Sequence, residues 1–194
     1  MFKRWVVYLA SVLGRLLLVG GVLGTLVWAL ISARLPSLDV LTDYQPKLPL
    51  RVLSEEGTVL AEFGEERRSI VKLAEVPVHV RQAILAAEDA NFYEHSGVDW
   101  LAALRAAYTN TIGGPRSGAG TITMQVARNF FLTRERSGVA GYLRKANEVV
   151  LTFKIEHDLT KDQILELYIN QIYLGQRAYG FAAAAKAYYG KPLE

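Results

Sequence analysis

The chain has 194 residues, 51% of them hydrophobic and 21% charged, which excludes a disordered or low-complexity protein. It contains no cysteine, so disulfide bonds, thiolate metal sites and cysteine nucleophiles are also excluded. The net charge of +3 would be consistent with a nucleic-acid-binding protein. However, residues 1–33 carry three basic and no acidic side chains and account for all of it, because the other 161 residues carry 19 basic and 19 acidic side chains. We therefore expect no nucleic-acid partner.

Residues 16–33 are 18 consecutive uncharged residues, close to the length that crosses a hydrocarbon core of about 30 Å. The alternative is a cleaved signal peptide, but such apolar cores usually have about 7–15 residues and no clean cleavage site follows here. Basic residues precede the run, so the positive-inside rule places the N-terminus in the cytoplasm. We expect residues 1–15 to be a cytoplasmic tail and span entry, followed by one retained transmembrane anchor.

A proline-containing linker is expected at residues 34–49, followed by a small β element and then helices. The turn residues Ser-Glu-Glu-Gly predict a hairpin of residues 50–53 and 58–63, with residues 69–73 as a third strand. Helical patterns begin at residue 77 and continue at residues 100–111, 121–132, 142–158, 161–173 and 181–189. The expected fold class is therefore mainly α.

The segment EDANFYEHSG at residues 88–97 is the first candidate site. Val80, Ile84 and Glu88 are four residues apart, which places Glu88 on the apolar face of a helix. Burial there would raise the pKa of the carboxyl group toward the range of a general base. The alternative is that the helix ends here and that Glu88 and Asp89 are solvated.

Two further segments are candidates for binding an anion. A glycine-rich loop at residues 118–120 enters a helix and could present N–H groups to an anion, although it lacks the Lys-Ser/Thr ending of a nucleotide P-loop. Arg144, Lys145 and Glu148 are either a solvated helix face or two cations for a phosphate beside a second acid. Four tyrosines either pack in the core or line a sugar groove, and core packing is the simpler reading: Tyr173, Tyr179, Tyr188 and Tyr189.

In their order and spacing, EDANFYEHSG, GAGTITMQ, RKANE, KDQILELYIN and GQRAYGFAAAAKAYYGK resemble the five motifs of peptidoglycan glycosyltransferases. The anchor and LRVLSEEGTVLAEFGEERR look like the start of a bifunctional class A penicillin-binding protein. This resemblance implies a lysozyme-like glycosyltransferase fold at residues 50–194, with its small β element near the membrane. It also implies a single-pass protein of the bacterial inner membrane whose periplasmic domain polymerises lipid II into β-1,4 glycan strands, with inversion and release of undecaprenyl pyrophosphate.

The resemblance also assigns roles to residues. Glu88 would be the general base and Glu148 a second catalytic acid near the departing phosphate, and Asp89, Phe92 and His95 would complete the first motif and position Glu88. The pyrophosphate site would comprise Thr121, Gln125, Arg128, Asn129, Arg144 and Lys145. Residues 55–99 hold 10 acidic and 4 basic groups, and residues 100–154 hold 2 acidic and 8 basic groups, so the base and the phosphate ligands would lie in oppositely charged stretches. No cofactor is required, although a divalent cation (Mg²⁺ or Mn²⁺) could share the charge of the leaving group.

The chain departs from the family pattern at Gly120, where serine is usual, and at Met124, where glutamine is usual. Ser-x-x-Lys, Ser-x-Asn and Lys-Thr-Gly motifs are absent, so the sequence looks like a fragment without a transpeptidase domain and with an incomplete C-terminus. Three alternatives remain open: a monofunctional transglycosylase of the same family, a muramidase-like hydrolase, and a non-catalytic membrane-anchored scaffold. Expected partners are lipid II, the growing lipid-linked glycan, the membrane and other cell wall synthesis proteins.

Overall fold

The computed structural model describes residues 2–32, 37–42, 49–57, 59–64, 66–114, 118, 120–132 and 138–193. Its internal contacts divide the chain into two units, Met1–Pro36 and Ser37–Glu194. The end of the predicted anchor, most of the predicted linker and part of the glycine-rich loop lie outside the described residues.

The first unit is one long helix, α1, which spans Phe2–Ser32. Within it, Ala10–Leu30 is long and apolar enough to cross a membrane, judged by length and composition. This stretch begins earlier than the predicted span at residue 16 and includes Arg15, because residues 5–14 are uncharged as well. Large apolar side chains such as Leu17 and Leu18 are more than two-thirds exposed, so this helix has no protein core of its own.

The β element at the start of the second unit agrees with the predicted hairpin. Strands β1 (Leu50–Leu53) and β2 (Val59–Phe63) pair antiparallel, and Gly57 takes a positive φ of 82° in the turn between them. The predicted third strand at residues 69–73 is wrong. The strand here is β3 (Arg67–Arg68), and it pairs in parallel with β4 (Ala178–Tyr179), more than 100 residues away.

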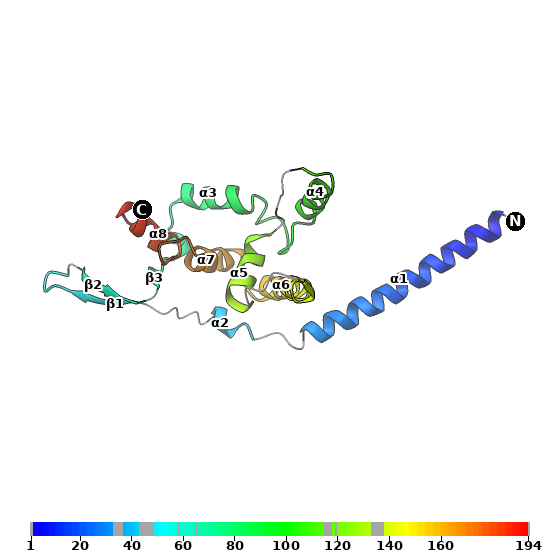
Figure 1. Ribbon diagram of the computed structural model, residues 1–194, viewed down its shortest axis with the longest axis horizontal. Coiled ribbons are helices and arrows are strands. Elements are labelled where there is room, and N and C mark those ends of the chain that lie inside the picture. Colours follow the sequence, from blue (N-terminus) through cyan, green and yellow to red (C-terminus); the bar gives the residue numbers. More distant parts are fainter. Residues whose placement is uncertain are drawn as a thin grey trace. The chain divides into compact units, whose positions relative to one another are not determined.

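Helices make up most of the second unit (Figure 1), which confirms the mainly α prediction. Their bounds are α2 Asp39–Thr42, the short 3₁₀ turn η1 Leu73–Glu75, α3 Val78–Glu88, α4 Trp100–Thr111, α5 Ile122–Phe131, α6 Gly138–Asp158, α7 Lys161–Gln171 and α8 Phe181–Tyr189. Helix α5 packs against both α6 and α7. Fully buried apolar side chains from these three helices form the core that supports the site: Ile122, Val126, Leu151, Ile155, Ile164 and Leu165.

Side-chain caps fix where three of these helices begin. Thr160 and Gln163 form the predicted capping box of α7, and the Thr121 hydroxyl accepts from the backbone N–H of Met124 at the start of α5. Asp99 caps α4 by accepting from the Ala102 N–H, and this hydrogen bond lowers the pKa of the Asp99 carboxyl group. The caps therefore fix the residues at which α4, α5 and α7 begin.

Candidate active site

Glu88 is the last residue of α3, and its side chain is exposed. Its Oε2 accepts a hydrogen bond of 2.8 Å from Nε2 of Gln125 on α5. Of the two readings that the sequence left open, burial of Glu88 is wrong and the end of the helix at a solvated Glu88 is confirmed, because the apolar face of α3 reaches the core only as far as Ile84, which is 5% exposed. Glu88 is therefore an accessible carboxylate that Gln125 orients.

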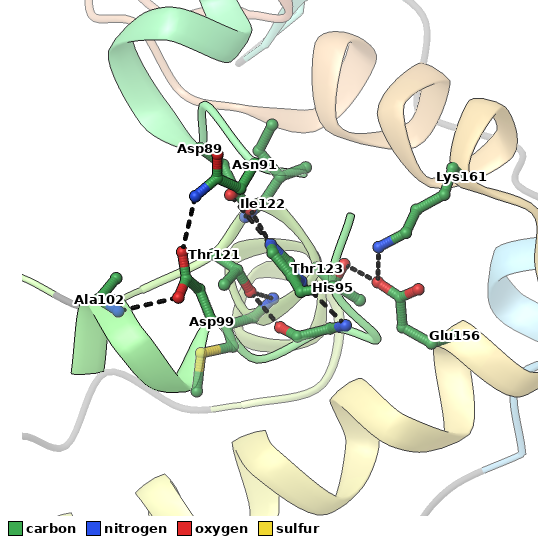
Figure 2. Close-up of polar contacts among 12 residues, drawn as sticks. Asp89, Asn91, His95, Asp99, Ala102, Thr121, Ile122, Thr123, Glu156 and Lys161 are labelled. Carbon is green, nitrogen blue, oxygen red and sulfur yellow. Dashed lines mark hydrogen bonds and ion pairs between the residues drawn. The ribbon is translucent and has the colours of Figure 1, made fainter. Parts of the chain in front are cut away.

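The buried acid is its neighbour, Asp89, whose side chain is 4% exposed. Asp89 accepts from the backbone N–H of Ile122 at 3.0 Å, and His95 Nε2 lies 3.0 Å from its other oxygen (Figure 2). Gly97 N–H donates to His95 Nδ1, so Nδ1 is the acceptor and the ring proton belongs on Nε2, facing the carboxylate. Asp89 thus joins the loop after α3 to the first turn of α5.

The start of α5 is consequently not a free anion site. The Ile122 N–H is bound by Asp89 and the Met124 N–H by the Thr121 hydroxyl, which itself donates to the carbonyl of Gly97. Thr121 is 3% exposed and both of these interactions are internal to the protein. The glycine-rich segment therefore contributes a cap, and the idea that it presents N–H groups to an anion does not hold for these two groups.

A second polar cluster, formed by Glu156, Lys161 and Thr123, lies beside the loop that follows α3 (Figure 2). Glu156 on α6 accepts from Lys161 Nζ at 2.8 Å and from the Thr123 hydroxyl. The same ammonium group lies 4.4 Å from the ring centroid of Phe92, which is fully buried. Tyr93 adds a link to α7 by donating to Asp162, and burial together with that carboxylate raises the pKa of Tyr93 to about 12.

Glu148 on α6 is 1% exposed and forms ion pairs with two cations. Arg144 Nη1 lies 3.0 Å from one carboxylate oxygen and Lys145 Nζ lies 2.8 Å from the other. The reading of these residues as a solvated helix face is wrong for Glu148. A buried carboxylate whose two oxygens both face cations is suited to hold those cations in place.

A cavity of about 510 Å³ opens beside this triad. Its lining combines guanidinium groups, amides and tyrosines: Glu66, Arg68, Arg128, Asn129, Leu132, Arg144, Gln171, Ile172, Tyr173 and Tyr179. Three arginines and one carboxylate make this lining net positive. The Nε atom of Arg144 is buried and has no hydrogen-bond partner among the residues that the structure describes.

Two observations bring Glu88 and this cavity close together. Gln125, which contacts Glu88, and Arg128, which lines the cavity, are one helical turn apart on α5, a rise of about 4.5 Å. The buried hydroxyl of Tyr168 on α7 also lies in the field of both groups. Burial raises the pKa of Tyr168, with Glu88 raising it further and Arg128 lowering it. An accessible carboxylate and a cationic cavity therefore lie on neighbouring parts of one surface.

The predicted site residues separate into two groups. The first group comprises the exposed carboxylate of Glu88, its partner Gln125, and three residues that line the cavity, Arg128, Asn129 and Arg144. The others are buried, or bind a buried acid among them: Asp89, Phe92, His95, Thr121, Lys145 and Glu148.

Sequence reasoning missed Arg68 and Gln171 and undervalued Tyr173 and Tyr179. Tyr173 is 51% exposed, so core packing is wrong for it, and its ring centroid lies 5.0 Å from that of Tyr179. Arg68 reaches the cavity only because β3 pairs with β4. No local pattern signals that pairing, since the two strands have two residues each.

Comparison with known proteins gives consistent matches. A family profile described as Transglycosylase matches residues 56–194. Penicillin-binding protein 1A of Neisseria gonorrhoeae is 54% identical over 159 residues, covering 81% of this chain and 19% of that protein. Penicillin-binding protein 1A of Pseudomonas aeruginosa is 50% identical over 165 residues, covering 84% and 20%. A crystal structure of penicillin-binding protein 1A from Haemophilus influenzae matches at 26% identity and a TM-score of 0.34, over 77% of this chain and 12% of that one. The chain spans about a fifth of the length of the curated relatives it matches.

Proposed function

The chain belongs to the transglycosylase family, and from this premise we propose that it is a peptidoglycan glycosyltransferase that polymerises lipid II in cell wall synthesis. The observation that carries the proposal is the convergence of Glu88 with the cationic cavity along α5. A glycosyl transfer to a hydroxyl group needs a base for the nucleophile and positive charge for a pyrophosphate leaving group. This surface supplies both.

In the proposed reaction, Glu88 takes the proton of the 4-hydroxyl of the incoming lipid II. The oxygen attacks the anomeric carbon of the growing chain, and the bond from that carbon to the pyrophosphate oxygen breaks with inversion from α to β. The electron pair leaves with undecaprenyl pyrophosphate, whose negative charge Arg128 and Arg144 stabilise. Exposure of Glu88 suits this role because the base must reach a hydroxyl that arrives from outside.

We assign Glu148 the role of a positioning residue. Both of its oxygens face cations, and Arg144, which it holds, lines the cavity. Arg144 and Lys145 take up both carboxylate oxygens of Glu148, so neither oxygen is placed to give a proton to a leaving sugar. A muramidase-like hydrolase needs such a proton donor, which makes that alternative less consistent with the site.

The cavity lining offers one carboxylate, that of Glu66. Across the described parts of the chain, no three His, Asp or Glu side chains gather in a way that could hold a metal ion. A divalent cation, Mg²⁺ or Mn²⁺, would therefore enter this site in company with the pyrophosphate oxygens. In the proposed mechanism the arginines are the resident positive charge.

The membrane setting is also part of the proposal. Ala10–Leu30 would anchor the chain in the inner membrane with the N-terminus in the cytoplasm and the catalytic domain in the periplasm. Helix α4 supports a membrane-bound domain because five of its flanking and surface residues are large, apolar and more than 60% exposed: Trp100, Leu101, Leu104, Tyr108 and Ile112. Lipid II, the lipid-linked glycan and other cell wall synthesis proteins would be its partners.

The test is polymerisation of lipid II by the chain in detergent micelles or vesicles. Glu88→Gln should lower the rate by about 100-fold or more, as expected for loss of a general base. Glu94→Gln is the matched control, since Glu94 is an exposed acid six residues away that lines no part of the cavity. Near-normal synthesis by Glu88→Gln would contradict the base assignment, and no synthesis by the unaltered chain would contradict the proposed function.

A further inference from the structure

Arg68 is a buried guanidinium that lies outside the five motifs. It is 7% exposed and occupies the inward position of a two-residue strand, whereas the adjacent Arg67 points outward and is exposed. A buried arginine is costly unless its charge and its N–H groups are matched. Its surroundings therefore indicate what keeps it there.

Three side chains hold Arg68 in one orientation. Its Nε donates to Glu66 at 2.7 Å, its Nη1 donates to Gln171 at 2.8 Å, and its Cζ lies 4.4 Å from the ring centroid of Tyr179. The strand itself is fixed, because the Arg67 N–H donates to the carbonyl of Arg177 at 2.8 Å. Arg68 is thus preorganised by α7, β4 and its own strand.

The same side chain lines the cavity with Arg128 and Arg144. Three guanidinium groups therefore reach one cavity from three separate elements, β3, α5 and α6. Glu66 offsets one of these charges, which leaves the lining with a net charge of about +2. A pyrophosphate diester carries about two negative charges, so the lining matches it only when Arg68 is counted.

We propose that Arg68 is a further binding residue for the pyrophosphate of the lipid-linked donor. The inference rests on the proposed function and extends it, because it adds a cation that the motifs do not contain. In a partly buried cavity the charge of Arg68 acts on the ligand with little screening by water. Its fixed orientation means that binding does not have to order a flexible side chain.

The first experiment is a titration of the 194-residue chain in detergent micelles with inorganic pyrophosphate, followed through the arginine Nε–Hε signals by NMR. The Arg68 signal should shift with the same midpoint as that of Arg128, while the Arg67 signal stays unchanged. No shift at Arg68 when Arg128 shifts would overturn the inference. This measurement uses the unaltered chain, so it does not depend on how well a variant folds.

The second experiment compares variants by calorimetric titration with pyrophosphate. Arg68→Gln should weaken binding at least 10-fold, Arg68→Lys should stay within about 3-fold because it keeps the charge, and Arg67→Gln should change it less than 2-fold. Equal affinities for Arg68→Gln and Arg67→Gln would overturn the inference. Neither experiment needs turnover. If pyrophosphate binding depends on Arg68 in a chain that does not polymerise lipid II, the proposed function is contradicted and the binding role of Arg68 is not.

Discussion

Asp89 and Glu88 are adjacent acids with opposite surroundings, and the difference decides what each can do. Glu88 ends α3 in solvent, whereas Asp89 turns inward and accepts from the Ile122 N–H and from His95. Because the backbone turns at Asp89, which has ψ near 79°, the two side chains leave the chain in different directions. The accessible acid is free to meet a substrate, and the buried acid fixes the loop from which it projects.

We predict that Asp89→Asn destabilises the fold. An amide presents an NH₂ group to one of two donors, so one buried group loses its partner at a cost of about 1–3 kcal/mol. Urea unfolding monitored by circular dichroism should show this loss in the free energy of unfolding. Glu94→Gln, an exposed acid in the same loop, should be within about 0.5 kcal/mol of the unaltered chain. Equal stability of the two variants would contradict the role given to Asp89.

Among the elements, α5, α6 and α7 meet around one ion pair. Glu156 near the end of α6 and Lys161 at the start of α7 are 10% and 21% exposed, and they reach Thr123 on α5 and the ring of Phe92. Gly97 packs against the same place, since a Cβ there would lie 2.9 Å from Glu156 Cγ. The pair therefore joins three helices to the loop after Glu88.

Lys161→Met should remove the cation while keeping a side chain of similar length. We expect a loss of about 1–3 kcal/mol in the free energy of unfolding, because Glu156 keeps the Thr123 hydroxyl but loses its ion pair. Combining it with Glu156→Gln should recover part of that loss, which a double-mutant cycle would measure. Lys186→Met, at an exposed position of α8, is the control and should be close to neutral. A loss for Lys161→Met no larger than that of the control would contradict the role given to the ion pair of Glu156 and Lys161.

For the whole molecule, the boundary between the first and the second unit lies earlier than the sequence predicts. Residues 34–49 read as a linker, yet α2 lies within them and belongs to the second unit. Leu38 and Leu41 are 6% and 4% exposed, and Leu41 lines a cavity of about 300 Å³ with Ile70, Leu159 and Leu167. Residues within a few positions of the end of α1 are thus already part of the core of the second unit.

Leu41→Ala should lower the free energy of unfolding of the body by about 2–3 kcal/mol, toward the low end for a buried leucine because an existing cavity adjoins it. Thermal unfolding in detergent, followed by near-ultraviolet circular dichroism, would measure the change. Leu13→Ala is the matched control, since Leu13 lies in α1 and is 59% exposed. Equal midpoints for the two variants would show that α2 does not pack on the body as described.

The sequence by itself determined the hairpin, the order of the helices from α3 onward, the capping box of α7 and the family. Each of these depends on residues a few positions apart, such as Thr160 with Gln163 or the turn at Gly57, so the local pattern is sufficient. Which of two adjacent acids is buried, and which arginines share a cavity, was decided only by the tertiary structure. Burial depends on where α3 ends relative to α5, and the position of Arg68 depends on β3 meeting a strand more than 100 residues away. Contacts of that range leave no periodic trace in the sequence, because each strand is too short to show one.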